Sequence, residues 1–155
     1  MSQQRLEKCE RFLQALPHAR KLQLKTISAE EGRVTMELPV QAQLQGPAAN
    51  TYLHGGVLTT LVDTACSGAV ICMLDPYELS PTLDLRIDHM TTACADKPLF
   101  VDAECYRKSR NVLFTRATVY QDSPEQPIAY AIATFMRLGA EITDKAFRNM
   151  VEGEA

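Results

Sequence analysis

Residues 54–74 read HGGVLTTLVDTACSGAVICML. The stretch opens on a histidine and two glycines, contains no proline and consists mostly of small and apolar residues. A segment of this length makes about five to six turns of α-helix and is far too long for an ordinary strand. We therefore predict one long helix over residues 54–74, and this helix decides the fold.

Period-two patterns dominate the chain after Pro76. Apolar and polar residues alternate in four segments, which we predict as strands over residues 82–90, 99–107, 112–121 and 128–138. The short break at 108–111 favours a tight antiparallel hairpin, and the proline-containing break at 122–127 favours a longer one. We therefore expect these strands to be antiparallel.

The chain before residue 54 adds a helix and two strands. Apolar residues recur at helical spacing up to Pro17, which predicts a helix over residues 2–16. Two alternating segments joined by Glu-Glu-Gly predict a hairpin. The expected ranges are strands at 22–27 and 33–40, a turn at 30–32, a loop at 41–51 and a terminal helix at 141–150.

Together these elements predict a single α+β domain over residues 1–155, with an antiparallel sheet of about six strands. One face of the sheet must be covered, and the helix at 54–74 is the only element large enough to cover it. The sequence shows no internal repeat and no linker.

Composition argues against several classes of protein. The net charge of -3, the absence of tryptophan and an aromatic content of 6% argue against nucleic-acid binding. The five cysteines lack Cys-x-x-Cys spacing and the three histidines are scattered, so we predict no disulfide framework, no metal site and no cofactor. Residues 1–10 lack the apolar core of a signal peptide, which predicts a cytoplasmic location.

Asp63 is the only charged residue between Glu37 and Asp75. Because a surface helix normally carries a charged face, we expect the helix at 54–74 to be buried on nearly all sides. A membrane span is the competing interpretation, since about 20 such residues can cross a bilayer. The central aspartate, the glycines and the lack of basic flanks argue against membrane insertion.

A carboxylate in a buried helix is costly unless it is paired or used. In one interpretation Asp63 is a satisfied structural residue, because Thr59, Thr60 and Ser67 lie on the same side of the helix and can donate hydrogen bonds. In the other interpretation Asp63 is a general base or a nucleophile. The sequence leaves both open.

His54-Gly55-Gly56 is the second candidate feature. Two glycines let a ligand approach the backbone closely, and free N–H groups in the first turn stabilise a developing oxyanion. The same residues also suit a sharp turn with a capping histidine. Asp63 follows His54 by about 13.5 Å along the helix and lies on its opposite side. If both features act on one atom, they come from two subunits of a twofold dimer.

Leu-His-Gly-Gly-Val at 53–57, Leu-Val-Asp at 61–63 and Thr-Leu-Asp-Leu-Arg-Ile at 82–87 resemble segments of one known family, the hot-dog-fold acyl-CoA thioesterases of the phenylacetic-acid-degradation (PaaI) type. Segments at 109–112 and 129–135 are also similar, and the resemblance covers about residues 20–138. It implies a sheet wrapped round a central helix, dimers that often pair into tetramers, and hydrolysis of an acyl-CoA thioester.

The resemblance also implies a role for each candidate residue. The Gly56 N–H polarises the thioester carbonyl, and Asp63 of the facing subunit is the nucleophile or the base that activates water. Thr82 lies where family members often have a serine or threonine that orients this water. His54 helps to hold the loop or the thioester.

Two predictions concern the rest of the substrate site. Family members often carry an asparagine six residues before the histidine, where this chain has Ala48, so either Asn50 serves instead or the role is lost. Arg107, Lys108 and Arg110 cluster at the predicted hairpin. They either contact the phosphates of coenzyme A or form a solvated hairpin tip.

Acyl-CoA hydrolysis is the function that the sequence favours, with acyl-CoA as the partner and no nucleic acid or membrane insertion. No Gly-x-Ser-x-Gly motif indicates a serine hydrolase. A hydratase or dehydratase of the same fold needs a histidine with a carboxylate, and His89 and Asp88 lie in a predicted strand rather than at the helix. A non-catalytic acyl-CoA-binding protein is the third alternative.

Overall fold

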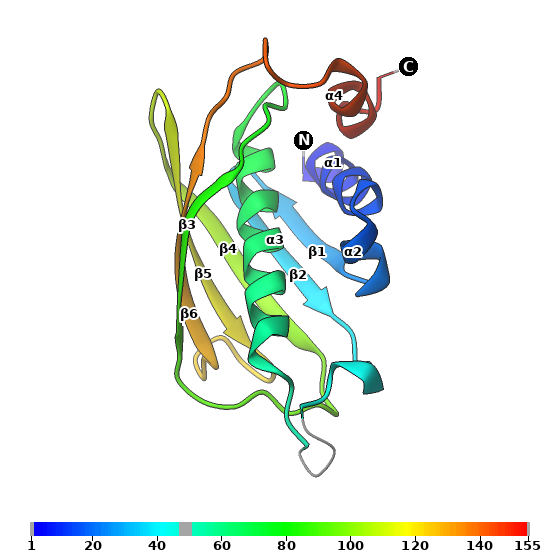
Figure 1. Ribbon diagram of the computed structural model, residues 1–155, viewed down its shortest axis with the longest axis vertical. Helices are drawn as coiled ribbons and strands as arrows, with labels where there is room; N and C mark the ends of the chain where they lie inside the picture. Colours follow the sequence, from blue (N-terminus) through cyan, green and yellow to red (C-terminus); the bar gives the residue numbers. More distant parts are fainter. Residues whose placement is uncertain (1, 47–50, 155) are drawn as a thin grey trace.

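The computed structural model describes residues 2–46 and 51–154, and the long helix α3 (Gly55–Met73) is its central element. This helix crosses one face of a six-stranded antiparallel sheet with the order β1-β2-β4-β5-β6-β3 (Figure 1). The strands are β1 (Lys25–Glu30), β2 (Arg33–Leu38), β3 (Thr82–His89), β4 (Leu99–Lys108), β5 (Val112–Tyr120) and β6 (Ala129–Met136). The α+β prediction and the strand number are therefore confirmed.

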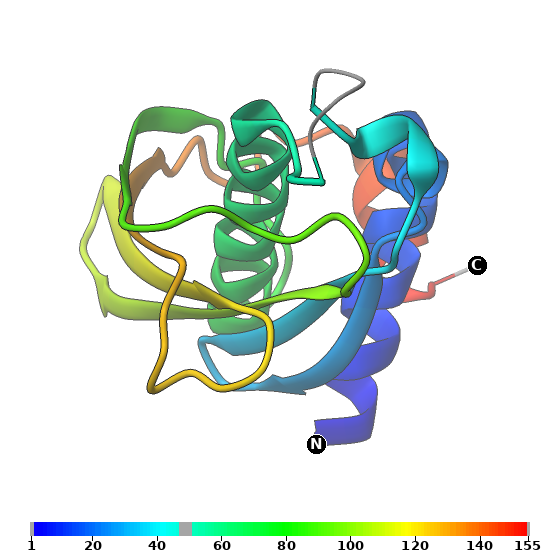
Figure 2. The same ribbon diagram turned by 90° about the horizontal axis from the view of Figure 1, so that it is seen from below.

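The sheet curves around α3, as the view from below shows (Figure 2). The chain leaves β2, passes through α3 and enters β3 at the far edge of the sheet. It then returns to β4 beside β2 and completes the sheet through β5 and β6. As a result, β3 pairs only with β6, and its other edge has no partner among the described strands.

The core lies between α3 and the inner face of the sheet. Strand residues alternate between the two faces, and those that face α3 are buried. A methyl group at Gly68 would lie 2.6 Å from Met36 Cε, so glycine lets α3 approach β2 closely. Fully burying one leucine or valine contributes about 1.5 to 3 kcal/mol. The buried inward residues include Val34, Met36, Leu38, Leu99, Val101, Ala103, Leu113, Ala117, Val119, Ala131, Ala133 and Phe135.

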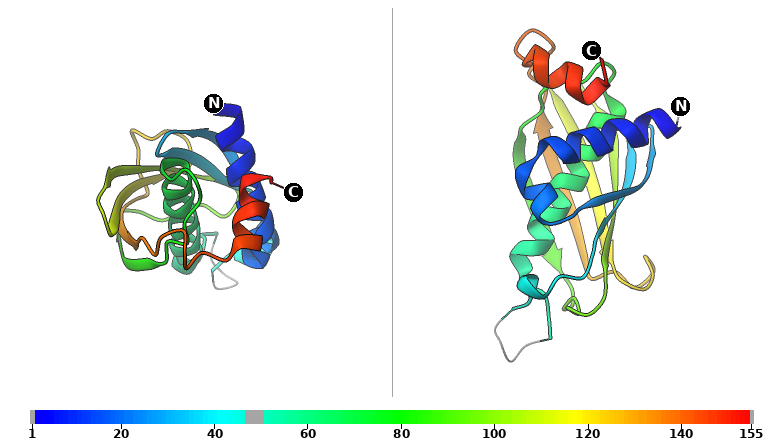
Figure 3. Two further views of the ribbon diagram at one scale, coloured as in Figure 1. Left: turned by 90° about the horizontal axis from the view of Figure 1, so that it is seen from above. Right: turned by 90° about the vertical axis from the view of Figure 1, so that its right-hand side faces the viewer.

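Two terminal helices close the side of the molecule away from β3. α1 (Ser2–Ala15) and α4 (Lys145–Glu152) lie beside each other (Figure 3). Lys8 of α1 forms an ion pair of 2.7 Å with Glu152 of α4 and donates to the Leu74 carbonyl at 2.9 Å. The Tyr77 N–H donates to the same Glu152 oxygen at 2.6 Å. This network covers the C-terminal end of α3.

Several predicted boundaries differ from the structure for local reasons. The first helix ends at Ala15, and Pro17 begins a short helix, α2 (Pro17–Lys21), because proline suits the first helical turn. The following strand therefore starts at Lys25 rather than residue 22. The terminal helix starts at Lys145 rather than residue 141, because the Asp144 carboxylate caps it by accepting from the Phe147 N–H at 2.7 Å.

Two smaller loop features complete the described chain. The predicted loop after β2 contains a short 3-10 helix, η1 (Ala42–Leu44). The turn before β2 is confirmed, and its Gly32 has a φ of 66°, in the left-handed region that favours glycine. Of the described helices, α3 alone is long and apolar enough to cross a membrane, and 61% of its apolar stretch is buried inside the fold.

The expected burial of α3 on nearly all sides is wrong for its first half. His54, Gly55, Gly56 and Thr59 are exposed, whereas every residue from Thr64 to Cys66 is buried. The prediction failed because a lack of charge does not distinguish a helix covered by its own chain from one with an uncovered apolar or neutral strip.

Candidate active site

Asp63 lies on the open strip of α3 and faces the beginning of β3. Its side chain is half-buried, and its Oδ1 accepts a hydrogen bond of 2.7 Å from the Thr82 hydroxyl. The contact joins the middle of the helix to the edge strand of the sheet. The structure therefore brings together two of the predicted site residues, and it leaves the carboxylate reachable from solvent.

In the described structure, none of the predicted intrahelical partners of Asp63 donates a hydrogen bond to it. Thr60 donates to the Gly56 carbonyl at 3.2 Å, and Thr59 makes a long 3.5 Å contact with the Gly55 carbonyl. Threonines inside helices often bond back to the preceding turn in this way. The prediction that helix residues donate to Asp63 is therefore wrong for Thr59 and Thr60. Their positions around the helix do not determine which acceptor each hydroxyl bonds.

His54 caps the first turn of α3. Its Nδ1 accepts a hydrogen bond of 3.0 Å from the Gly56 N–H, the donor that the resemblance assigns to the thioester carbonyl. A methyl group at Gly56 would lie only 3.1 Å from this nitrogen, whereas one at Gly55 would have 3.8 Å to its nearest neighbour, His89 Cε1. The imidazole therefore already accepts from the N–H that the resemblance assigns as the oxyanion donor.

An open cavity of about 350 Å³ lies directly over the Asp63–Thr82 pair. Thr59, Thr60 and Leu85 line it, together with His18 of α2. His18 is not among the residues that the sequence predicts for the site. No sequence signal links it to Asp63, because the two residues come together only when α2 packs beside the open strip of α3. The cavity offers a carboxylate, three hydroxyls and an imidazole beside one apolar side chain.

The helix start does not line this cavity. His54, Gly55 and Gly56 are absent from its lining, as expected for residues about 10.5 to 13.5 Å from Asp63 along the helix. One chain therefore does not place the glycine N–H groups beside Asp63.

His89 and Asp88 lie at the end of β3 away from Thr82, and their side chains have different surroundings. His89 lies near the start of α3, 3.8 Å from the position of a methyl group at Gly55. Asp88 instead forms an ion pair of 2.9 Å with Arg86. The two residues belong to opposite faces of the strand, so they do not form the histidine–carboxylate pair that a hydratase needs.

The basic residues lie at the β4–β5 hairpin, near the end of α3 opposite Gly55 (Figure 1). Arg107, Lys108 and Arg110 are exposed, and within the described chain they form no ion pair. The Ser109 hydroxyl fixes the turn by accepting from the Val112 N–H at 3.1 Å. Asn50 and Ala48 lie outside the described residues.

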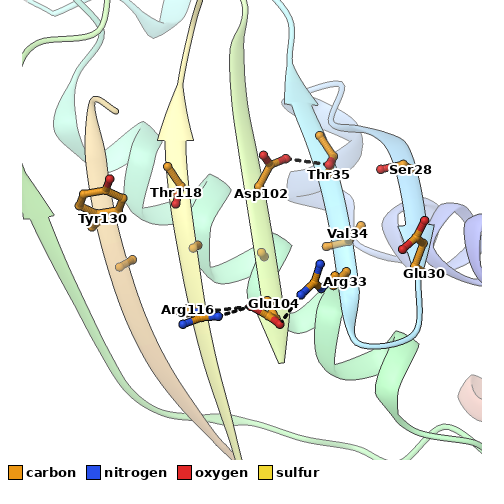
Figure 4. A pocket seen from close by; sticks show the side chains of 13 residues that line it. Ser28, Glu30, Arg33, Val34, Thr35, Asp102, Glu104, Arg116, Thr118 and Tyr130 are labelled. Atoms are coloured by element: carbon orange, nitrogen blue, oxygen red, sulfur yellow. Dashed lines mark hydrogen bonds and ion pairs between the residues drawn. The ribbon is translucent and has the colours of Figure 1, made fainter. Parts of the chain in front are cut away.

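The outer face of the sheet carries a separate charged cavity of about 460 Å³ (Figure 4). Glu104 accepts hydrogen bonds from Arg116 at 2.7 and 2.9 Å and from Arg33 at 2.8 Å, and these bonds lower the pKa of its carboxyl group. Asp102 accepts from the Thr35 hydroxyl at 2.7 Å. This contact is of the same kind as the one between Thr82 and Asp63, but the cavity lies on the outer face of the sheet, away from α3.

Comparison with known proteins agrees with this fold. The thioesterase superfamily model matches residues 50–128. A crystal structure of a Pseudomonas aeruginosa protein has 45% sequence identity and a TM-score of 0.79, covering 86% of this chain and 99% of that chain. No curated protein sequence matches the chain.

Two more distant structures share the fold. The PaaI protein from the Escherichia coli phenylacetic acid degradation operon has 20% identity and a TM-score of 0.78, covering 89% of this chain and 96% of that one. A Streptococcus mutans protein bound to acetyl-CoA has 22% identity and a TM-score of 0.67, covering 75% and 89%. The family match, the close relative and the helix-wrapping sheet agree: the chain belongs to the thioesterase superfamily and has its hot-dog fold.

Proposed function

We propose that the protein hydrolyses acyl-CoA thioesters at sites shared between two subunits. The observation that carries the proposal is the Asp63–Thr82 pair, a solvent-accessible carboxylate held at 2.7 Å by a hydroxyl beneath an open cavity. A carboxylate in this setting can take a proton from water, and Thr82 fixes the orientation of its oxygen atoms. A thioester carbonyl is electrophilic enough for such a base and one oxyanion donor to suffice.

A second copy of the chain supplies the missing donor in this proposal. The open strip of α3 lies beside β3, whose outer edge carries unpaired backbone groups and whose Leu83 is 55% exposed. An antiparallel second copy can extend the sheet through β3 and place its own α3 across the strip. The twofold axis then brings Gly56 of each chain towards Asp63 of the other. Light scattering distinguishes a dimer from a dimer of dimers.

The reaction follows from these groups. Asp63 takes a proton from water as the water oxygen attacks the thioester carbonyl, and the carbonyl electrons move onto oxygen. The Gly56 N–H, released from His54, donates to that oxyanion at the positive end of the helix dipole. The tetrahedral intermediate then re-forms the carbonyl and breaks the carbon–sulfur bond, and the departing coenzyme A thiolate takes back the proton that Asp63 removed from water. Direct attack by Asp63 would instead pass through an acyl-aspartyl anhydride.

The basic hairpin provides a place for the nucleotide part of the substrate. Arg107, Lys108 and Arg110 are free to form charge-assisted hydrogen bonds with phosphate groups. A protein of the same fold binds acetyl-CoA, which supports this class of ligand.

A panel of acyl-CoA substrates tests the function through release of free thiol. We expect hydrolysis of at least one substrate by the wild type, and a loss of at least about a hundredfold in kcat for Asp63→Asn, as for other lost acid–base groups. Asp75→Asn is the matched control, because Asp75 is an exposed aspartate just beyond α3.

Three results would exclude the proposal. Equal activity of Asp63→Asn and the wild type would remove the assigned base. Tight binding of coenzyme A without any turnover would identify a binding protein. Loss of enoyl-CoA absorbance in place of thiol release would identify a hydratase.

A further inference from the structure

Two buried thiols meet where α1 crosses the end of α3. Cys9 of α1 and Cys72 of α3 have their sulfur atoms 3.3 Å apart, although 63 positions separate them in the chain. Both are free thiols, and neither belongs to the proposed acyl-CoA site. We propose that Cys9 and Cys72 form a peroxide-reactive pair that closes to a disulfide between α1 and the last turn of α3.

The geometry is close to that of a disulfide. A disulfide bond is about 2.05 Å long, so the two sulfur atoms must approach by about 1.3 Å. Both side chains lie in the contact between two helices that are already packed together. The other three cysteines, Cys66, Cys94 and Cys105, have no comparable sulfur contact in the described structure.

Cys72 also has a route to solvent. It lines a cavity of about 670 Å³ between α1 and the end of α3, and Arg5, Lys8 and Lys108 line the same cavity. Hydrogen peroxide is nearly as small as water and can enter a space of this size. Cys9 is fully buried behind Cys72, which makes Cys72 the first thiol that an oxidant meets.

The electrostatics favour Cys72 as the attacking group. The hydrogen bond from Cys9 and the positive charges of Arg5 and Lys8 hold the pKa of Cys72 below its ordinary value. The same contact and burial raise the pKa of Cys9. A thiolate is the nucleophile in thiol oxidation, so the pair contains one activated sulfur and one resolving thiol.

The proposed reaction consumes one hydroperoxide. The Cys72 thiolate attacks a peroxide oxygen and breaks the O–O bond, giving a sulfenic acid and, after protonation, water. The Cys9 sulfur then attacks the Cys72 sulfur, loses its proton and displaces a second water. In total, two thiols and one hydrogen peroxide become one disulfide and two waters, and sulfur supplies both electrons that reduce the peroxide.

Thiol counting on the folded protein tests this proposal. The reduced protein is treated with hydrogen peroxide, denatured and alkylated, and its intact mass is measured. We expect the number of alkylated cysteines to fall from five to three without formation of a covalent dimer. Trypsin should then release peptide 9–11 linked to peptide 34–86.

Variants identify the partner within the long peptide, which contains both Cys66 and Cys72. Cys66→Ser, a matched change at another buried cysteine of α3, should keep the cross-link, and Cys72→Ser should abolish it. Cys9→Ser should accumulate a sulfenic acid at Cys72 that a 1,3-dione traps. The proposal fails if Cys94 is oxidised while Cys9 and Cys72 remain alkylated, or if the cross-link contains Cys66. Mapping of the wild type decides this even if a variant fails to fold.

Discussion

The two halves of α3 are both composed mostly of small and apolar residues, but the first half is partly exposed and the second half is almost wholly buried. The first half keeps an open strip from His54 to Asp63, bordered by the edge strand β3. The second half is enclosed by the sheet and by α1, and the Lys8–Glu152 pair closes its end. The comparison indicates that the chain completes its own core at one end of the helix and leaves the other end open, in our proposal for a ligand and a second subunit.

The covered half should respond to mutation through stability. Glu152→Ala leaves Lys8 buried without its carboxylate, and we expect a loss of about 2 kcal/mol in the free energy of unfolding. This is below the 3 to 5 kcal/mol typical of a fully buried pair, because the Glu152 side chain keeps 15% exposure. Denaturant unfolding measures the change, and Glu154→Ala is the control. A normal midpoint for Glu152→Ala, or a lower kcat in the folded enzyme, would break the comparison.

The open half should respond through activity. Thr82→Val removes the hydroxyl that donates to Asp63. We expect kcat to fall about tenfold, because the carboxylate is no longer held in the orientation that proton transfer needs. The free energy of unfolding should fall by no more than about 1 kcal/mol, because the pair is open to solvent. Thr82→Ser keeps the donor and should retain most of the activity. Equal loss in the serine and valine variants would show that packing, rather than the hydroxyl, matters at this position.

His54 contributes to the stability of the helix start, and it contacts the N–H that we propose as the oxyanion donor. His54→Ala removes the acceptor of the Gly56 N–H, and we expect the protein to lose about 1 kcal/mol of stability, as for other N-caps. His54→Asn supplies another capping acceptor and should restore the melting temperature. If the asparagine variant has the same melting temperature as the alanine variant, the imidazole stabilises the helix start by some means other than capping.

The sequence predicted the elements better than their surroundings. Helix 54–74 and the strands around it follow from hydrophobic period and from glycine and proline positions, which are local properties. The exposure of its first half is not local, because it depends on which faces the remaining chain reaches. The sequence left open whether His54 caps the helix, and the hydrogen bond from the Gly56 N–H shows that it does.

The candidate site was predicted only in part. Asp63 was identifiable because a lone carboxylate in an uncharged stretch is unusual, and His54, Gly55 and Gly56 were identifiable from the glycine pair at the helix start and from the family resemblance. The direct contact of Asp63 with Thr82 depends on the crossing of α3 and β3, which no spacing rule gives. His18 was missed for the same reason, since a short helix without a motif brings it to the cavity.

Subunit complementation tests the shared site most directly. Asp63→Ala removes the proposed base, and Gly56→Pro, in the first turn of α3, removes the proposed N–H donor together with its capping bond to His54. Each variant alone should be inactive. Refolding an equal mixture should form mixed dimers with one intact site, and we expect about a quarter of the wild-type activity. If mixed dimers form and the mixture stays as inactive as its parents, Gly56 and Asp63 do not act across a subunit boundary.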